Sequence, residues 1–358
     1  MVKRDKKHVS LFASFIMLSL IVILAACSSD KTSGDSGKSN GSDEKKVYTF
    51  NLNSVYPDTT LAGLNFIGPE FIKEVEKRSN GRIVIKPFYS NELVPQSEIL
   101  SALSSNTIDL GLTSPVYFGD SVPTASTQSL PYWSKSLEHS YKLYRETGVG
   151  ELFEKELEEH GVKVLAYAVG GSGYGFALNK PIKKYEDLSK LLLRSSGWAT
   201  DTWYKNVGIS GASIPLAETY DALQRGVVDG TPWSFTELES SKYGEVVKYI
   251  VQPAFINGGL SGLFINKDAW NKLPEDLQKV MTEVAQEMEL KALETNKEKE
   301  KTIQAQVDKY NIEVINLPKD FQKKLYDSAQ VVWDEYAKLN GNTAKTVEIL
   351  RKENGGSQ

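Results

Sequence analysis

The residue best suited to recognise a ligand is Arg194, which directly follows three leucines at 191–193. An apolar run of this kind after a polar turn is typical of a buried parallel strand. Open α/β sheets bind their ligands at the carboxyl ends of such strands. A guanidinium placed there can hold a carboxylate through two parallel hydrogen bonds. Judged from this stretch alone, pairing with a structural acid of the protein itself is equally consistent.

Catalysis by cysteine or histidine has little support. Cys27 is the only cysteine, and beyond the N-terminal segment the only histidines are His139 and His160. Both lie in charge-rich, helical surroundings, and neither has a partner at the spacing of zinc ligands. A histidine-based serine triad is therefore not expected. We predict no catalytic residue, no cofactor and no metal site.

The glycine-rich run at 170–175 follows an apolar stretch and superficially suggests a phosphate-binding loop. It lacks the spacing of dinucleotide-binding loops and of the nucleophile elbow, and the residues after it are typical of a strand. Glycines in such a place tolerate unusual dihedral angles and let the backbone approach a ligand. We interpret the run as a crossing between two lobes.

The first 27 residues have the features of a lipoprotein signal peptide. A basic start precedes an apolar stretch over 11–23 that is short for a membrane-spanning helix, and the residues Leu-Ala-Ala-Cys end at Cys27. We expect Cys27 to carry a lipid, and a plain signal peptide with an incidental cysteine is the alternative. Residues 28–46 are polar and predict a flexible tether. The mature protein is thus expected on the extracytoplasmic face of the cell membrane.

The rest of the chain alternates between strand and helix patterns, which favours α/β lobes with mainly parallel sheets. About 310 residues exceed the usual size of a single core, so two lobes are expected. Nucleic acid is not an expected partner, because 42 basic and 46 acidic residues nearly balance and no basic cluster follows the signal region. The pattern predicts strands over 47–53, 82–88, 108–113, 176–179, 227–230, 260–266 and 312–317, and helices over 61–78, 96–104, 199–207, 217–225, 274–309 and 321–339, with two more helical pieces within 137–160.

The segment 218–230, ETYDALQRGVVDG, resembles the signature of the TRAP-transporter solute-binding receptors, the dicarboxylate-receptor (DctP) family. The strand ending in arginine, the following helix and a small-residue turn precede it in the family's order. The similarity extends from about residue 48 to about residue 350. It implies an α/β, two-lobed type II periplasmic-binding-protein fold with a long helix joining the lobes. The implied lobe one is 47–171 plus 259–298, the implied lobe two is 172–258 plus 299–350, and 351–358 form a tail.

The resemblance implies that Arg194 binds the carboxylate of the ligand. It also places Asn53, Ser54 and Ser114 at strand ends that face the ligand, although such residues often only cap turns. Asp229, in the signature block, is expected to be a structural acid.

Three positions depart from the pattern of the family. Tyr174 stands where many members have a second arginine, Trp233 where some have asparagine, and Leu216 at a position that tends to face the ligand. Trp198 either adds aromatic surface to the site or belongs to the core. A monocarboxylate with an apolar or aromatic body is therefore expected rather than a highly charged sugar acid.

The resemblance thus implies a receptor that is not an enzyme. It would capture a small organic anion, hold it between the lobes and deliver it to the membrane subunits of a TRAP permease. Two alternatives remain at this point. The same lobes would also suit a binding protein that serves a sensor kinase or an ABC importer, and an exported hydrolase is opposed by the shortage of histidine and cysteine.

Overall fold

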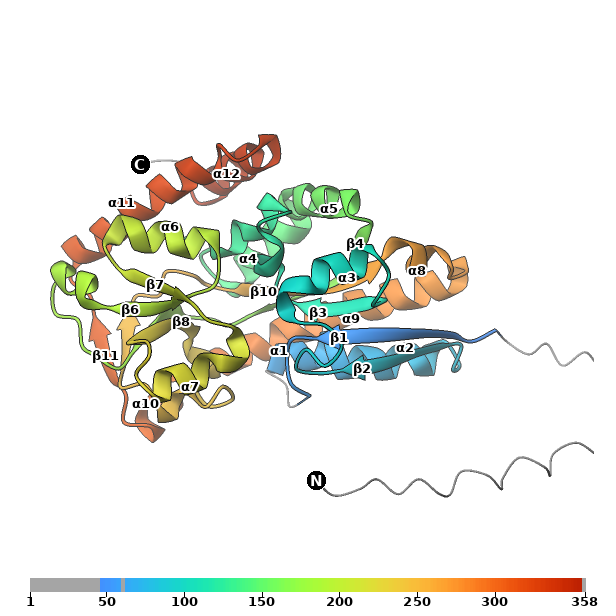
Figure 1. Cartoon of the computed structure of the whole chain (residues 1–358), viewed down its shortest axis with the longest axis horizontal. Helices are drawn as coiled ribbons and strands as arrows, with labels where there is room; N and C mark the ends of the chain where they lie inside the picture. Colours follow the sequence, from blue (N-terminus) through green and yellow to red (C-terminus); the bar gives the residue numbers. More distant parts are fainter. Residues whose placement is uncertain (1–45, 59–61, 356–358) are drawn as a thin grey trace, which may run out of the picture. The chain divides into compact units, whose positions relative to one another are not determined.

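Strands far apart in the sequence assemble into two β-sheets in the computed structural model of the chain, which describes residues 46–58 and 62–355 (Figure 1). The predicted signal peptide, Cys27 and residues 28–45 of the predicted tether lie outside the described residues. Among the helices of the described part, none combines the length and the apolar character that a membrane span requires.

The first sheet has the order β2-β1-β3-β10-β4. Strand β1 pairs in parallel with β2 and β3, whereas β10 runs antiparallel to β3 and β4. Its buried strand β3 consists of apolar and small residues, as expected for a strand covered on both faces. The strands are β1 (Tyr48–Ser54), β2 (Ile83–Phe88), β3 (Leu110–Thr113), β4 (Val162–Gly170) and β10 (Gly259–Asn266).

The second sheet has the order β11-β9-β5-β8-β6-β7. Strand β6 is parallel to β7 and β8, and β5 is antiparallel to β8 and β9. Both sheets are therefore mixed rather than mainly parallel, because β5 and β10 enter their sheets from the opposite direction. The strands are β5 (Tyr174–Leu178), β6 (Leu192–Ser195), β7 (Ser210–Ser213), β8 (Gly230–Ser234), β9 (Tyr249–Gln252) and β11 (Glu313–Asn316).

Helices pack around both sheets (Figure 1). The predicted helix over 61–78 is wrong as one continuous element, because Gly68 has non-helical dihedral angles and Pro69 follows it within a π-helical turn. The helices are α1 (Ala62–Asn65), α2 (Phe71–Arg78), α3 (Ile99–Ser104), α4 (Leu137–Glu146), α5 (Val149–Glu159), α6 (Trp198–Val207), α7 (Thr219–Gln224), α8 (Lys267–Asn271), α9 (Glu275–Glu300), α10 (Ile303–Lys309), α11 (Lys319–Tyr336) and α12 (Gly341–Glu353).

Helix α9 joins the two lobes. Its buried apolar side chains pack on the first sheet and its helices, where α9 contacts β4, α1 and α2. Its carboxyl end contacts the turn Phe235–Glu237 (η7), which follows β8 of the second sheet. The helix ends at Glu300 and α10 begins at Ile303, so the prediction of one helix up to 309 is wrong. The predicted two-lobed α/β fold with a long joining helix is confirmed.

The chain first passes between the sheets at the glycine-rich run, between the end of β4 and the start of β5. Gly171 has φ +68°, and a Cβ on it would lie 2.4 Å from the Tyr174 ring. A Cβ on Gly175 would lie 2.5 Å from the Phe235 ring and 2.6 Å from the Val251 carbonyl oxygen. Side chains at these two places would displace their neighbours, so the crossing requires glycine there.

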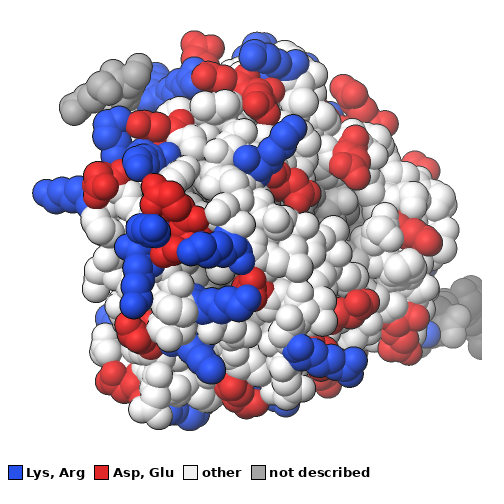
Figure 2. Space-filling view, turned by 60° about the vertical axis from the view of Figure 1, so that its left-hand side comes forward, with Lys and Arg blue, Asp and Glu red and all other residues white. Residues whose placement is uncertain are grey.

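Charged side chains of both signs are interspersed on the face shown in Figure 2. This mixture agrees with the near balance of 42 basic and 46 acidic residues in the whole sequence. A surface of this kind favours solubility over attraction to a strongly charged polymer.

Candidate functional site

A cavity lies between the two sheets and receives side chains from both. It holds about 160 Å³ of solvent-accessible space. Its walls combine aromatic and apolar side chains with many polar and charged ones. The lobe of the first sheet contributes Tyr56, Ser114, Tyr117, Gln128, Leu260 and Ser261, and that of the second contributes Tyr174, Arg194, Trp203, Leu216, Trp233 and Glu237.

Arg194 lines this cavity, although its side chain is only 5% exposed. Its Nε donates a hydrogen bond to the carbonyl oxygen of Ile214 at 3.0 Å. Within the described residues it forms no ion pair with an aspartate or glutamate. A guanidinium carries five N–H donors, and a buried charge without a partner is costly. Arg194 is thus a buried cation at the cavity wall without an acidic partner among the described residues.

Asp229, from the signature block, holds the strand that carries Arg194 in place. The carboxylate of Asp229 accepts a hydrogen bond from the Leu192 backbone N–H at 3.0 Å, and the Asp229 N–H donates to the Leu192 carbonyl oxygen at 2.7 Å. Lys180 lies 2.6 Å from the same carboxylate. Asp229 thus fastens the start of β6 to the start of β8, while the buried side chain of Leu193 anchors the middle of β6 in the core.

Two neutral tyrosines, Tyr174 and Tyr56, provide hydrogen-bonding groups in the cavity that Arg194 lines. Burial raises the pKa of the Tyr174 phenol, the nearby charge of Glu237 raises it further, and Arg194 acts in the opposite direction. Burial also raises the pKa of Tyr56, whose hydroxyl is 2.7 Å from that of Ser261. Both phenols consequently stay protonated at physiological pH and act as polar contacts rather than as charges.

Aromatic rings pack against one another at the cavity wall, with Trp233 between Tyr174 and Tyr243. The Tyr174 and Trp233 rings are 6.2 Å apart between centroids, and Trp233 also packs against Tyr243 at 4.6 Å. The indole Nε1 of Trp233 is buried and has no hydrogen-bond partner among the described residues. An unpaired buried donor of this kind is costly to the fold.

Five of the eight residues predicted from the sequence line this one cavity: Arg194, Ser114, Tyr174, Leu216 and Trp233. Ser114 donates its hydroxyl hydrogen to the Leu260 carbonyl oxygen at 3.1 Å and accepts a hydrogen bond from the Gln128 amide at 3.1 Å.

The other three predicted residues are not among those that line the cavity. The Asn53 carboxamide accepts hydrogen bonds from the backbone N–H groups of Leu93 and Val94. The Ser54 hydroxyl bonds to the backbone of Tyr56, two residues later. The Trp198 ring packs against Tyr336 at 6.0 Å between centroids, which is the core role left open above.

Several cavity residues had not been predicted from the sequence, notably Tyr56, Gln128, Glu237 and Asn296. Tyr56 lies two residues after the end of β1, and its place just beyond a strand end could have indicated a residue that lines the cavity. The others come from turns or from α9 and reach the cavity only through the tertiary fold. Within residues 46–58 and 62–355 there is no group of three or more His, Cys, Asp or Glu side chains arranged to hold a metal ion.

Comparisons with known proteins identify relatives of the chain in sequence and in fold. Residues 53–339 match the family described as bacterial extracellular solute-binding protein, family 7. The monocarboxylate 2-oxoacid-binding periplasmic protein of Nostoc sp. is 29% identical over 233 residues, which are 64% of this chain and 63% of that protein.

Two solved structures share the fold. A TRAP periplasmic solute-binding protein from Rhodoferax ferrireducens with bound malonate has a TM-score of 0.75 at 25% identity, covering 85% of this chain and 97% of that one. A Bordetella pertussis extracytoplasmic solute receptor binding pyroglutamic acid has a TM-score of 0.78 at 21% identity, covering 85% and 99%.

Proposed function

Because the chain belongs to the bacterial extracellular solute-binding proteins of family 7, we propose that it is the receptor of a TRAP transporter, captures an organic acid and delivers it to a membrane permease. The observation that carries this proposal is the buried Arg194, which lines the cavity and has no acidic partner among the described residues. The bound solutes of the Nostoc and Rhodoferax proteins, a 2-oxoacid and malonate, support the acid as the ligand class.

Capture follows from the position of the cavity between two lobes. In the proposed boundaries, lobe one is 47–171 plus 259–298 and lobe two is 172–258 plus 299–350. Ligand enters an open form, and Arg194 binds its carboxylate. Closure then removes water and strengthens this pairing, because electrostatic attraction grows as the local dielectric falls. The ligand shifts the balance toward the closed form only to the extent that it binds that form better.

The proposed ligand is a monocarboxylate with an apolar or aromatic body. One guanidinium lines the cavity together with Tyr174, Leu216 and Trp233. We expect isothermal titration against a panel of acids to give at least roughly tenfold tighter binding for such a monocarboxylate than for dicarboxylates of similar size, a difference of about 1.4 kcal/mol. Mass spectrometry of any small molecule that co-purifies provides a second readout. Tight binding of polar dicarboxylates alone would contradict this ligand class.

We also propose that the mature chain is anchored to the membrane through a lipid on Cys27, as residues 1–27 predict. Replacing Cys27 with serine is expected to abolish the lipid modification, because serine has no thiol to carry the lipid. Intact-protein mass spectrometry should show the loss of the lipid mass. Ser28→Ala is the matched control and should stay with the membrane. An unmodified protein without a lipid mass on Cys27, or a Cys27 variant that still carries it, would contradict the anchor.

A further inference from the structure

A second ionised side chain lines the cavity, and its sign is opposite to that of Arg194. Glu237 is the last residue of the turn η7 and is only 5% exposed. It was not among the residues predicted to bind the ligand. A carboxylate so deeply buried is costly unless it is paired or hydrogen-bonded. Its partners therefore decide whether it serves the fold or the ligand.

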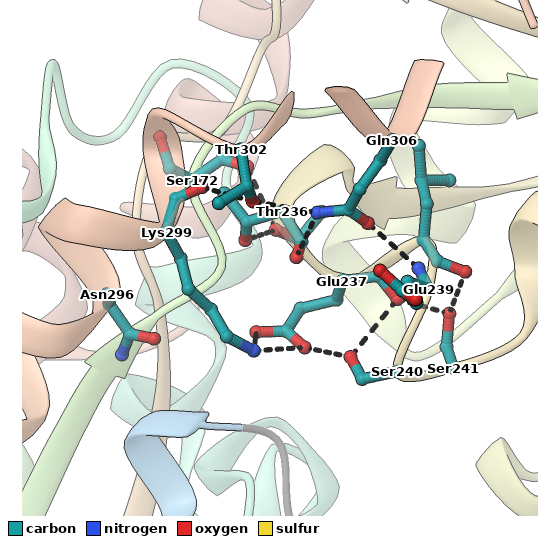
Figure 3. A network of polar contacts seen from close by, with 12 residues as sticks. Ser172, Thr236, Glu237, Glu239, Ser240, Ser241, Asn296, Lys299, Thr302 and Gln306 are labelled. Carbon is teal, nitrogen blue, oxygen red and sulfur yellow. Dashed lines mark hydrogen bonds and ion pairs between the residues drawn. The ribbon is translucent and has the colours of Figure 1, made fainter. Parts of the chain in front are cut away.

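Among the described residues, the Glu237 carboxylate is paired with Lys299 and accepts a hydrogen bond from Ser240 (Figure 3). Lys299, from the last turn of α9, approaches with its Nζ 3.4 Å from both carboxylate oxygens. Strong charge-assisted hydrogen bonds are typically about 2.7–2.9 Å long. The Ser240 hydroxyl donates one further hydrogen bond to this carboxylate. An ionised carboxylate has about four acceptor sites, so Glu237 retains the capacity to accept from a ligand.

The loop around Glu237 has its own support, which does not involve this carboxylate (Figure 3). The Gln306 side chain donates to the Thr236 carbonyl oxygen at 3.1 Å and accepts from the Glu239 N–H at 2.9 Å. The Ser241 hydroxyl bonds to the Glu237 backbone carbonyl oxygen. The loop is therefore expected to keep its conformation when the carboxylate is replaced by an amide of the same shape.

The cavity thus contains one cation and one anion, and aromatic rings line it as well. Arg194, Glu237 and Tyr174 all line this one cavity. Trp233 and Tyr117 line the same space. Aromatic faces attract ammonium groups, which adds to the attraction of the carboxylate. A second ligand carboxylate, in contrast, would meet a buried like charge.

We propose that Glu237 determines specificity by binding an ammonium group of the ligand, so that the solute is an amino-monocarboxylic acid whose carboxylate binds Arg194. This inference rests on the proposed function and narrows its ligand class. The ammonium group makes a direct charge-assisted hydrogen bond to the acceptor capacity of Glu237 that Lys299 and Ser240 leave free, inside the closed cavity. The neutral phenols of Tyr56 and Tyr174, which line the same cavity, complete the polar surroundings of the zwitterion.

The test uses pairs of acids that differ only in the ammonium group, titrated calorimetrically into the whole mature protein. The pairs are phenylalanine with 3-phenylpropionate, leucine with 4-methylpentanoate, and 5-aminopentanoate with pentanoate. We expect the amino member of at least one pair to bind at least tenfold more tightly. If the deaminated acids bind as well as or better than their partners in every pair, the inference is overturned and the receptor for organic acids stands. If no acid binds at all, the proposed function itself fails.

Two variants separate a ligand contact from a structural ion pair. Glu237→Gln should lower affinity for the amino member at least tenfold and leave the deaminated member unchanged or tighter. Lys299→Gln removes the protein partner of Glu237 and should preserve the preference for the amino member. Equal losses of affinity in both variants, or no loss in Glu237→Gln, would overturn the proposal. Thermal unfolding midpoints within a few degrees of the unmodified protein show that both variants fold.

Discussion

Replacing Arg194 with alanine is expected to weaken ligand binding by about 2–4 kcal/mol, because it leaves the carboxylate of the ligand buried without its cation. This corresponds to a loss of affinity of roughly 30- to 900-fold at 25 °C. Isothermal titration with the co-purifying ligand, or with the tightest acid of the panel, measures the effect directly. The burial of Arg194 explains the size of the expected effect, since the residue is only 5% exposed.

Arg225 supplies the matched control for this experiment. It is an exposed arginine beyond the end of α7 and in the same proposed lobe, but it does not line the cavity. Arg225→Ala should bind the ligand as the unmodified protein does. Arg194→Lys keeps the charge and loses the planar fork, so an intermediate loss is expected. Affinity of the alanine variant within twofold of the original would show that Arg194 is not the anchor.

The largest expected effect on folding comes from Arg145→Ala, which removes the cation beside a buried carboxylate of the joining helix. Glu289 in α9 is 2% exposed, and its carboxylate accepts hydrogen bonds from Arg145 and from the Tyr167 backbone N–H. Breaking such a pair by removing one partner typically costs about 3–5 kcal/mol. We expect a loss of this size in the free energy of unfolding, measured by urea denaturation followed by circular dichroism.

Neighbouring residues again provide controls. Arg78 pairs with Glu287, also on α9, but these side chains are 35% and 38% exposed. Arg78→Ala should therefore cost about 1 kcal/mol or less. A double replacement of Arg145 and Glu289 by methionine should recover most of the stability lost in Arg145→Ala, because no buried charge remains unpaired. A cost of Arg145→Ala as small as that of Arg78→Ala would refute the structural role of the buried pair.

The sequence predicted the strand-end arginine because its signal is local. An apolar run followed by arginine has one natural place in an α/β sheet, and β6 has that place. The same rule did not distinguish polar side chains that line the cavity from those that form hydrogen bonds with backbone groups of a loop. Asn53 lies at a strand end as predicted, yet its carboxamide is bonded to the loop at Leu93 and Val94. The rule gives the position along a strand, but the use of each polar group depends on which loop folds over it.

Elements without a hydrophobic pattern were missed for a related reason. Strand β7 consists of serine, glycine and alanine, so its pairing with β6 comes from backbone hydrogen bonds that leave no trace in side-chain periodicity. Strand β8 begins at Gly230, three residues after its predicted start, because the signature block continues as a turn up to Asp229. Glu237 was overlooked because no local pattern marks it. Its contacts with Lys299 and with the cavity form only when η7 packs against the end of α9.

The crossing glycines also limit how this receptor can change over evolutionary time. A Cβ added to Gly171 or to Gly175 would lie less than 3 Å from its nearest neighbouring atom. These positions therefore cannot acquire new ligand contacts without rebuilding the passage between the sheets. Leu216 and Pro232 line the same cavity, are partly exposed and already carry side chains. Descendants of this protein that adapt to other nutrients should therefore diverge at such wall positions and inherit the glycine passage unchanged.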